Sequence, residues 1–160
     1  MSIATRAADE RWMSLALESE RDAALAGEVP VGAVIVRDGT RLAQASNRTI
    51  RDQDPTAHAE AIAIREAAAM LGSWRLDGCS LYVTLEPCAM CAGAIILARV
   101  ERVVFGAWDE KAGMAGSVAD LLRHPKLNHR PEVLAGVCAE ESGKLLTEFF
   151  RERRGAAPTR

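Results

Sequence analysis

Two short motifs, thirty residues apart, constrain the fold of this chain more than any other feature. The first has the pattern H-x-E at residues 58–60, and the second has the pattern P-C-x-x-C at residues 87–91. Together they offer three side chains that bind Zn²⁺ well: His58, Cys88 and Cys91. Three protein ligands leave a tetrahedral metal one open position for water, as in catalytic sites, whereas structural zinc usually has four ligands. The fold must therefore bring the two motifs together.

The second motif suits the beginning of a helix. Cys88 and Cys91 are three residues apart, a spacing that puts both sulfur atoms on one face of a helix. Pro87 fits the first helical position, where its missing N–H costs nothing. The free N–H groups and the positive end of the helix dipole then favour the two thiolates over the thiols.

The first motif fits a helix less well. His58 and Glu60 are two residues apart, which on an ideal helix sends them to nearly opposite faces. We therefore expect His58 in an imperfect first turn after residues 55–56. The imidazole then reaches the metal, while Glu60 faces the open metal position that water occupies.

Each motif alone has a plainer interpretation. His followed by Glu in an Ala-rich segment is usually a helix surface, and a lone C-x-x-C is as often redox-active or half of a structural zinc site. The other two cysteines, Cys79 and Cys138, have neither a C-x-x-C neighbour nor a paired His. We interpret them as buried or partly buried residues, at a strand start and at a strand-to-helix junction. The combination of both motifs favours the zinc site.

The composition indicates one ordinary folded domain. The chain has 160 residues, of which 49% are hydrophobic and 26% charged. We expect a single domain over residues 1–154 and a flexible tail over residues 155–160. The longest apolar stretch, residues 89–98, is too short to cross a bilayer, and the first residues lack the apolar core of a signal peptide. We therefore expect a cytoplasmic protein with no membrane partner.

The net charge of the chain does not indicate a nucleic-acid partner, but two local clusters of basic residues do. The net charge of −2 says nothing of a nucleic-acid partner. Residues 123–130 and 151–154, however, are both rich in basic side chains, and a local patch is enough to hold phosphate groups. A solvated helix end that complements the helix dipole explains residues 151–154 equally well.

Periodicity and turn signals predict alternating helices and strands. A strand, a helix and a strand joined by short links imply a right-handed parallel crossover, so the sheet is mixed. The prediction is a three-layer α/β/α domain with a five-stranded mixed sheet, in which both zinc motifs lie at helix starts at one end of the sheet. In the first half of the chain, the predicted elements are a helix over 9–27, strands over 29–36 and 41–47 joined by an Asp-Gly hairpin turn, a helix capped by Thr56 and ending at 71–72, and a strand over 80–85. In the second half, they are a helix after Pro87, a strand over 102–106, a loop over 107–117, a short helix over 118–123, a strand over 133–137 and a helix over 140–154.

Beyond the zinc motifs, residues 9–154 resemble the cytidine deaminase-like fold and, more closely, the bacterial tRNA-specific adenosine deaminases. The H-x-E and P-C-x-x-C elements are typical of all zinc-dependent base deaminases. The His-Pro and Leu-Asn-His-Arg sequences within residues 124–130, and Phe-Phe-Arg at 149–151, point to the tRNA enzymes. Further matching segments lie at 29–33, 54–60, 84–94 and 103–107 and at Asn47.

The resemblance implies deamination of adenosine to inosine at the wobble position of a tRNA anticodon stem-loop, by a homodimer with one zinc ion per chain. It implies zinc ligation by the three residues named above and proton transfer by Glu60. Asn47 is implied to contact the target nucleotide and Asp109 to touch the RNA beside it. The remaining expected substrate contacts are Ala59, the backbone of Leu85 and Glu86, Phe149, Arg151, Arg153 and Arg154.

One position departs from the family pattern. Trp108 stands where relatives more often carry a small or basic residue. Aromatic residues such as Trp108, Phe149 and Phe150 are more often core residues than stacking platforms, so we expect at most one of them to contact RNA and assign that contact to Phe149.

Two alternative functions stay open at this point. A free-base or nucleoside deaminase acting on guanine or cytosine shares the catalytic half of the pattern. A zinc-stabilised RNA-binding or subunit-interaction module needs no catalysis, but the three-ligand set and the extra carboxylate of Glu60 argue against it.

Overall fold

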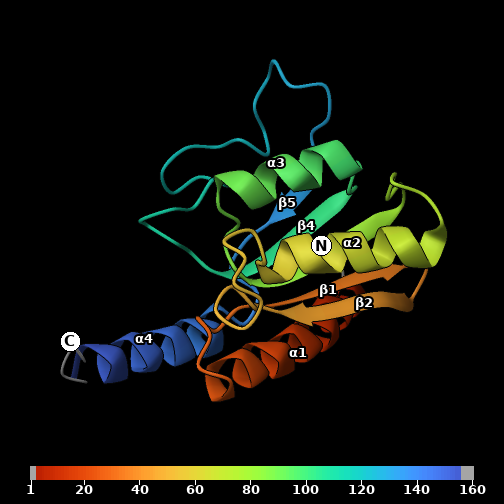
Figure 1. Cartoon of the computed structure of the whole chain (residues 1–160). Helices are drawn as coiled ribbons and strands as arrows, with labels where there is room; N and C mark the ends of the chain where they lie inside the picture. Colours follow the sequence, from red (N-terminus) through yellow and green to blue (C-terminus); the bar gives the residue numbers. More distant parts are fainter. Residues whose placement is uncertain (1–2, 156–160) are drawn as a thin grey trace.

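The computed structural model describes residues 3–155 as helices that alternate with strands (Figure 1). No helix in this described part combines the length and the apolar character that a membrane span requires. The elements are α1 (Ile3–Leu25), β1 (Gly32–Arg37), β2 (Thr40–Ser46), α2 (Ala59–Leu71), β3 (Cys79–Leu85), α3 (Ala89–Ala98), β4 (Arg102–Ala107), β5 (Glu132–Leu134) and α4 (Ala139–Gly155).

The strands form one mixed sheet in the order β2-β1-β3-β4-β5. β1 is antiparallel to both β2 and β3, whereas β3, β4 and β5 are parallel to one another. Asp38 and Gly39 have φ values of 49° and 73°, the left-handed pair that a tight two-residue hairpin turn needs. The predicted hairpin and the predicted mixed sheet of five strands are both confirmed.

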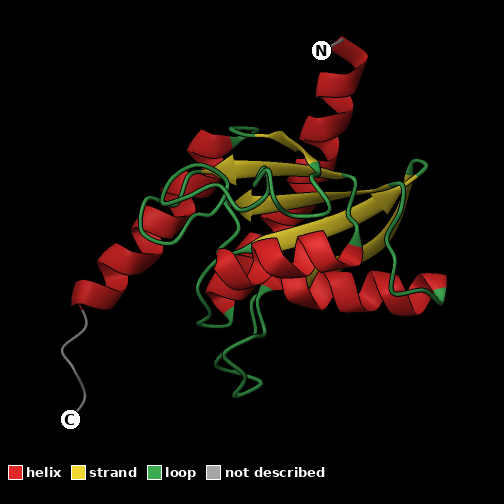
Figure 2. Ribbon diagram, turned by 90° about the horizontal axis from the view of Figure 1, so that it is seen from above, coloured by secondary structure: helices red, strands yellow, loops and turns green. Residues whose placement is uncertain are grey.

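Helices cover both faces of the sheet (Figures 1 and 2). Successive residues of β1 point to opposite faces, so that Ile35 belongs to the core under α2 and α3, while Val34 packs with Trp12 and Met13 of α1. A fully buried Val or Ile stabilises the fold by about 1.5–3 kcal/mol relative to an exposed one. These two apolar cores hold the three layers of the predicted α/β/α architecture together.

Several predicted boundaries are wrong. α1 begins at Ile3, well before residue 9. The sequence did not indicate this start, because residues 5–8 are exposed and carry no apolar repeat. The predicted short helix over 118–123 does not form. There the N–H groups of Val118 and Leu121 donate to the carbonyls of Gly113 and Met114, at 2.9 Å each, and not to a preceding helical turn.

The C-terminal third differs in two smaller ways. The fifth strand is shorter than predicted, because after Leu134 the N–H groups of Gly136 and Val137 both turn to the carbonyl of Phe105. Gly155 is the last residue of α4, and the rest of the predicted tail, residues 156–160, lies outside the described residues. Cys79 is buried and Cys138 is partly buried, as predicted.

Candidate zinc site and base pocket

The two zinc motifs lie at helix starts, as the sequence predicts, but His58 and Cys88 are cap residues, and of the three ligands Cys91 alone lies in a first helical turn. His58 caps α2 with an extended backbone (φ −80°, ψ 151°), and Cys88 caps α3 in the same way (φ −75°, ψ 177°). Pro87 therefore precedes the cap, so its predicted place at the first helical position is wrong. Neither side chain makes a capping hydrogen bond to its own helix, so both are available to a metal ion.

Thr56 does not cap α2, which corrects a second prediction. Its hydroxyl and its N–H both donate to Oδ1 of Asp54, at 2.7 Å and 2.8 Å. Asp54 thus forms a local Asx turn, and its hydrogen bonds with Thr56 keep the threonine from capping the helix. The turn delays the helix start to Ala59 and leaves His58 extended.

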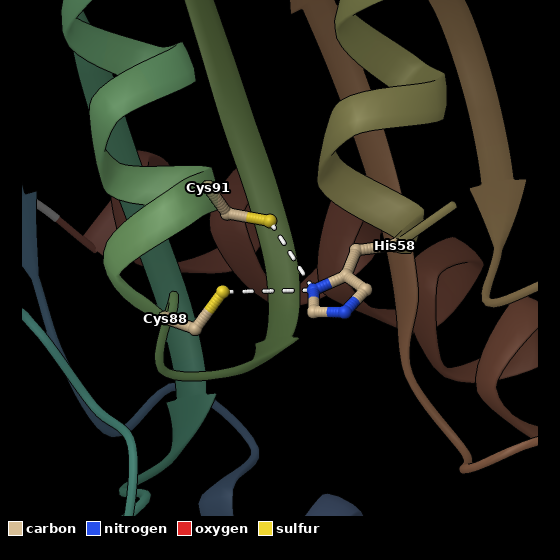
Figure 3. A group of neighbouring side chains, drawn as sticks. All are labelled: His58, Cys88 and Cys91. Atoms are coloured by element: carbon tan, nitrogen blue, oxygen red, sulfur yellow. Dashed lines mark hydrogen bonds between the residues drawn. The ribbon is translucent and has the colours of Figure 1, made fainter. Parts of the chain in front are cut away.

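His58, Cys88 and Cys91 form a compact group, which we call the zinc cluster (Figure 3). Nδ1 of His58 lies 3.6 Å from Sγ of Cys88 and 3.5 Å from Sγ of Cys91. Sulfur and nitrogen ligands at ordinary zinc distances in a tetrahedral arrangement are separated by about 3.5 Å. The donor set and its spacing therefore fit one Zn²⁺ ion, with room for a fourth, non-protein ligand.

The electrostatics of the zinc cluster favour a thiolate. Hydrogen bonds from Cys91 and His58 lower the pKa of Cys88 to about 4 against the opposing effect of burial. The pKa of Cys91 is raised by the hydrogen bond that it shares with Cys88, by burial and by the nearby Glu60. The hydrogen bond to Cys88 raises the pKa of His58. Protonation of any one of these three side chains therefore depends on the other two, and metal binding requires that their protons be released.

Glu60 is the second residue of α2 and is almost completely buried, with 4% of its surface exposed. Burial raises the pKa of its carboxyl group, while a hydrogen bond with Cys91 and the charge of His58 oppose this shift. A buried carboxyl beside a metal site, with its pKa raised above the ordinary value, holds a proton more readily than an exposed one and so suits proton transfer. The structure thus places Glu60 next to the zinc cluster, at the expected position.

A cavity of about 220 Å³, which we call the base pocket, opens beside the zinc cluster. It is smaller than the 300–1,000 Å³ typical of sites for drug-sized ligands, so it suits a single nucleobase. Its lining residues are Val29, Val31, Asn47, Thr49, His58, Glu60, Leu85, Glu86, Cys88, Asp109 and Ala112.

Most of the expected substrate contacts near the metal lie in this pocket, with one exception. Asn47, Leu85, Glu86 and Asp109 line it, whereas Ala59 is fully buried and its N–H is bonded to Asn47. Sequence reasoning did not single out the pocket residues Val29, Val31, Thr49 and Ala112. Val29 and Val31 belong to the matching segment 29–33 but had no assigned role, and Thr49 and Ala112 belong to no matching segment.

The expected contacts on α4 lie away from the base pocket. α4 extends beyond the body of the sheet toward the C-terminus (Figure 1). The guanidinium of Arg153 donates to the carbonyl of Gly27 and lies over the ring of Phe149, 4.7 Å from its centroid. Arg153 and Phe149 therefore join α4 to the turn after α1. All three arginines of this helix end are exposed, but within the described residues Arg151 and Arg154 make no such contact.

Trp108 lies at the entrance of the loop that follows β4. Half of its surface is exposed, and its ring meets Phe105 edge-on at 4.9 Å. The indole thus shields the end of the sheet and still presents a face to solvent.

Comparison with known proteins agrees with this geometry. Residues 6–107 match the family described as the cytidine and deoxycytidylate deaminase zinc-binding region. That stretch contains all of the zinc cluster together with Glu60. The chain belongs to this family of zinc-binding deaminases.

Similar proteins narrow the class. The chain is 51% identical over 146 residues to the tRNA-specific adenosine deaminase of Bacillus subtilis, covering 91% of both chains. It is 48% identical over 143 residues to the tRNA-specific adenosine deaminase of Agrobacterium fabrum, covering 89% of this chain and 94% of the relative.

Among solved structures, too, the chain is more similar to a tRNA deaminase than to a guanine deaminase. A structure from a study of A-to-I editing by tRNA:A34 deaminases at the wobble position has a TM-score of 0.82 and 46% identity, covering 84% of this chain and 98% of the other. A guanine deaminase from Nitrosomonas europaea has a TM-score of 0.76 and 26% identity, covering 88% and 83%. The fold is thus common to deaminases of different substrates.

Proposed function

We propose that this chain is a zinc-dependent deaminase that converts adenosine to inosine at the wobble position of a tRNA anticodon. The observation that carries the proposal is the buried carboxyl of Glu60 beside a three-ligand zinc cluster and an open base pocket. The choice of tRNA over a free base rests on the names of relatives that are about half identical to this chain over nine tenths of its length.

Zinc would be held by His58, Cys88 and Cys91, whose spacing fits its ligand distances. When bound, the metal supplies Lewis acidity and lowers the pKa of coordinated water to about 7. Cys79 and Cys138 lie elsewhere and take no part.

The protein's own contribution to the reaction is proton transfer and orientation. Glu60 accepts a proton from the attacking water and delivers it to the ring nitrogen of adenine, as oxygen adds to C6. Glu60 then takes the remaining proton from the new hydroxyl on C6 and passes it to the amino group; the C6–N bond breaks and ammonia leaves, so that adenosine and water give inosine and ammonia. Leu85, Asp109 and the other lining residues keep the base in place and exclude bulk water.

RNA selection requires surface outside the base pocket, because a pocket for one base cannot distinguish an anticodon loop from a free nucleoside. The exposed Arg151 and Arg154 on α4, and the basic residues within 123–130, are the groups we assign to phosphate contacts. The target adenine leaves the loop stack and enters the pocket, as in other single-stranded RNA recognition.

We further propose that the protein acts as a homodimer in the cytoplasm. Met70, Trp74 and Leu97 on the α2–α3 side of the sheet are all more than 60% exposed, which leaves apolar surface for a second copy to cover. Sedimentation equilibrium of the purified chain tests the dimer, and a monomer at micromolar concentration would contradict it.

One assay separates the proposed activity from its alternatives. Purified protein is incubated with an anticodon stem-loop carrying adenosine at the wobble position, and separately with adenosine, guanine and cytidine, and products are separated by chromatography. We expect inosine in the stem-loop alone. Deamination of guanine or cytidine instead would favour the alternative, a free-base or nucleoside deaminase. The Glu60→Ala variant is the control for contaminating deaminases.

A further inference from the structure

The carboxylate of Glu86 is enclosed by one loop, residues 109–117, which we call the 109–117 loop. Only 2% of the residue is exposed. Oε1 accepts a hydrogen bond from the N–H of Asp109 at 3.0 Å, and Oε2 accepts from the N–H groups of Ala115 at 2.9 Å and Ser117 at 3.1 Å. The hydroxyl of Ser117 donates to Oε1 as well. Both ends of the loop are thus bonded to one side chain.

These contacts use up the acceptor capacity of Glu86. A carboxylate has about four lone-pair sites, and four donors of the 109–117 loop point at its two oxygens. No acceptor site is left for a substrate or for a proton in transit. The side chain of Glu86 therefore has a task different from that of Glu60, although both carboxylates line the base pocket.

Gly113 shows how closely the loop wraps around this carboxylate. A Cβ atom added at Gly113 would lie 2.2 Å from both Cδ and Oε1 of Glu86, which is far inside contact distance. The loop is closed on itself by the N–H of Gly113, which donates to the carbonyl of Asp109 at 2.8 Å. It is also tied to the zinc motif, because the N–H of Met114 donates to the carbonyl of Pro87 at 2.8 Å.

The loop forms one wall of the base pocket through Asp109 and Ala112. Glu86 lies between the end of β3 and the zinc ligand Cys88, so the segment that carries the ligand also fixes this wall. We propose that Glu86 is a positioning residue, whose side chain holds the 109–117 loop closed against the base pocket and thereby sets the affinity for the target nucleotide. The substrate part of this inference rests on the proposed function, whereas the loop-holding part does not.

The first test measures the loop without any substrate. Glu86→Gln keeps the shape but replaces one acceptor oxygen with an N–H₂ group that faces N–H or O–H donors. One lost hydrogen bond to a charged group changes the balance between a closed and an open loop by about 10- to 100-fold. We expect amide hydrogen exchange of residues 109–117 to accelerate by that factor, with zinc content and the exchange of β3 and β4 unchanged.

Glu28 offers a matched control variant. It is also a fully buried carboxylate that accepts from loop N–H groups, those of Ile50 at 2.8 Å and Arg51 at 3.1 Å. Glu28→Gln should accelerate exchange in residues 48–54 and leave residues 109–117 protected. Acceleration of both loops by either variant would show general destabilisation and overturn the local role of Glu86.

The second test uses steady-state kinetics on whichever substrate the parent protein deaminates. An open wall weakens binding of the base but leaves Glu60 and the zinc ligands in place, so Glu86→Gln should raise KM about tenfold or more and change kcat less than threefold. A large loss of kcat with unchanged loop protection would make Glu86 part of the chemistry and overturn the proposal. Failure of the parent on the stem-loop would refute the proposed function, while the exchange experiment would still decide the loop-holding role.

Gly113→Ala approaches the same contact from the opposite side. Its methyl group must push the loop off the Glu86 carboxylate, so we expect the same exchange and KM changes while Glu86 itself is intact. Both changes break the same contact, between the 109–117 loop and the carboxylate of Glu86. The KM of the Glu86→Gln/Gly113→Ala double variant should therefore be little higher than that of either single variant. Multiplicative effects on KM would show that the two residues act separately and would overturn the proposal.

Discussion

The side-chain oxygen of Asn47 accepts a hydrogen bond from the N–H of Ala59 at 2.8 Å, and its amide nitrogen donates to the carbonyl of Val29 at 3.1 Å. Ala59 is the first residue of α2, and the N–H groups of a first helical turn have no partner within their own helix. Asn47, at the end of β2, supplies that partner from twelve residues away. It therefore fixes the start of the helix that carries His58 and Glu60.

Asn47→Ala should weaken both the fold and the metal site. Leaving the N–H of Ala59 buried without an acceptor costs about 1–3 kcal/mol of unfolding free energy. The displaced helix start should also lower zinc affinity, because metal ligands depend on the hydrogen bonds that orient their segments. Urea unfolding and competition with a zinc chelator measure the two effects.

Gln44→Ala is the matched control for this variant. Gln44 also lies on β2, and its amide bonds the carbonyl of Leu15 and the hydroxyl of Ser19 at 3.0 Å each, on the face away from the zinc cluster. It should lose stability with unchanged zinc affinity. Equal zinc affinity in the Asn47 and Gln44 variants would refute the positioning role of Asn47.

Cys88→Ser and Cys91→Ser should each lose zinc, since a neutral hydroxyl replaces a thiolate ligand. Metal analysis after dialysis gives the zinc-to-protein ratio, expected near one for the parent and far below one for either variant. Cys79→Ser is the control, because Cys79 is a buried cysteine outside the zinc cluster. Unchanged zinc in the Cys88 variant would rule out this ligand assignment.

Glu60→Gln should separate catalysis from zinc binding. Glu60 is assigned to proton transfer, a role that typically contributes about 10²–10⁴-fold to the rate, and the amide cannot carry a proton in this way. We expect a loss of kcat of at least that size with zinc content and melting temperature close to those of the parent. Single-turnover measurements with the stem-loop detect it, and appreciable turnover would assign the proton transfer to another group.

The zinc-binding motifs and the mixed character of the sheet could be predicted, because short sequence patterns indicate both. The Asp-Gly turn fixes the hairpin, and the two short metal motifs mark helix starts that topology brings to one end of the sheet. The helix start at Ala59 could not be predicted, because it depends on Asp54 capturing Thr56 and on Asn47 reaching across from β2.

Loop structure was the least predictable part. The segment over 118–123 carries a helical pattern of apolar residues, yet its N–H groups bond to the 109–117 loop. That loop is in turn shaped by Glu86, which is distant in sequence. The same holds for Arg153, which looks like a phosphate-binding residue in the sequence but bonds to Gly27 from the far end of the chain.

Glu20 should make the stability of the fold depend on pH. Neither oxygen of its fully buried carboxyl group makes a hydrogen bond of normal geometry within the described residues. Burial raises the pKa of Glu20 to about 8, against a smaller opposing effect of Thr84. The folded chain then holds a proton that the unfolded chain releases above its ordinary pKa of 4.5. This stabilising contribution is complete below that pH and is lost as pH rises toward 8.

The Glu20→Gln variant tests this linkage. Its unfolding free energy, relative to that of the parent, should increase by about 1.4 kcal/mol for each pH unit between roughly pH 5 and 8. Urea unfolding at several pH values across this range gives the slope. Parallel stability profiles of the two proteins would show that Glu20 keeps an ordinary pKa in the folded state.

The arginines of α4 should separate into two functional groups, because the fold uses one of them itself. Arg151 and Arg154 are exposed, so replacing both with Ala should weaken stem-loop binding and reduce the slope of log K against log salt by about 1.4–1.8, if each contacts one phosphate. Arg153→Ala should have a different effect: it removes the bond to Gly27 and the contact with Phe149, so it should loosen α4 and lower the melting temperature.

Filter binding at several salt concentrations, combined with thermal unfolding, separates these two effects. The Arg151→Ala/Arg154→Ala variant should keep the parent's melting temperature and zinc content while its salt slope flattens. An unchanged affinity and slope would leave α4 as a structural helix only. The phosphate contacts would then have to come from residues 108–117 beside the base pocket, or from the basic segment over 123–130, which projects beyond α3 (Figure 1).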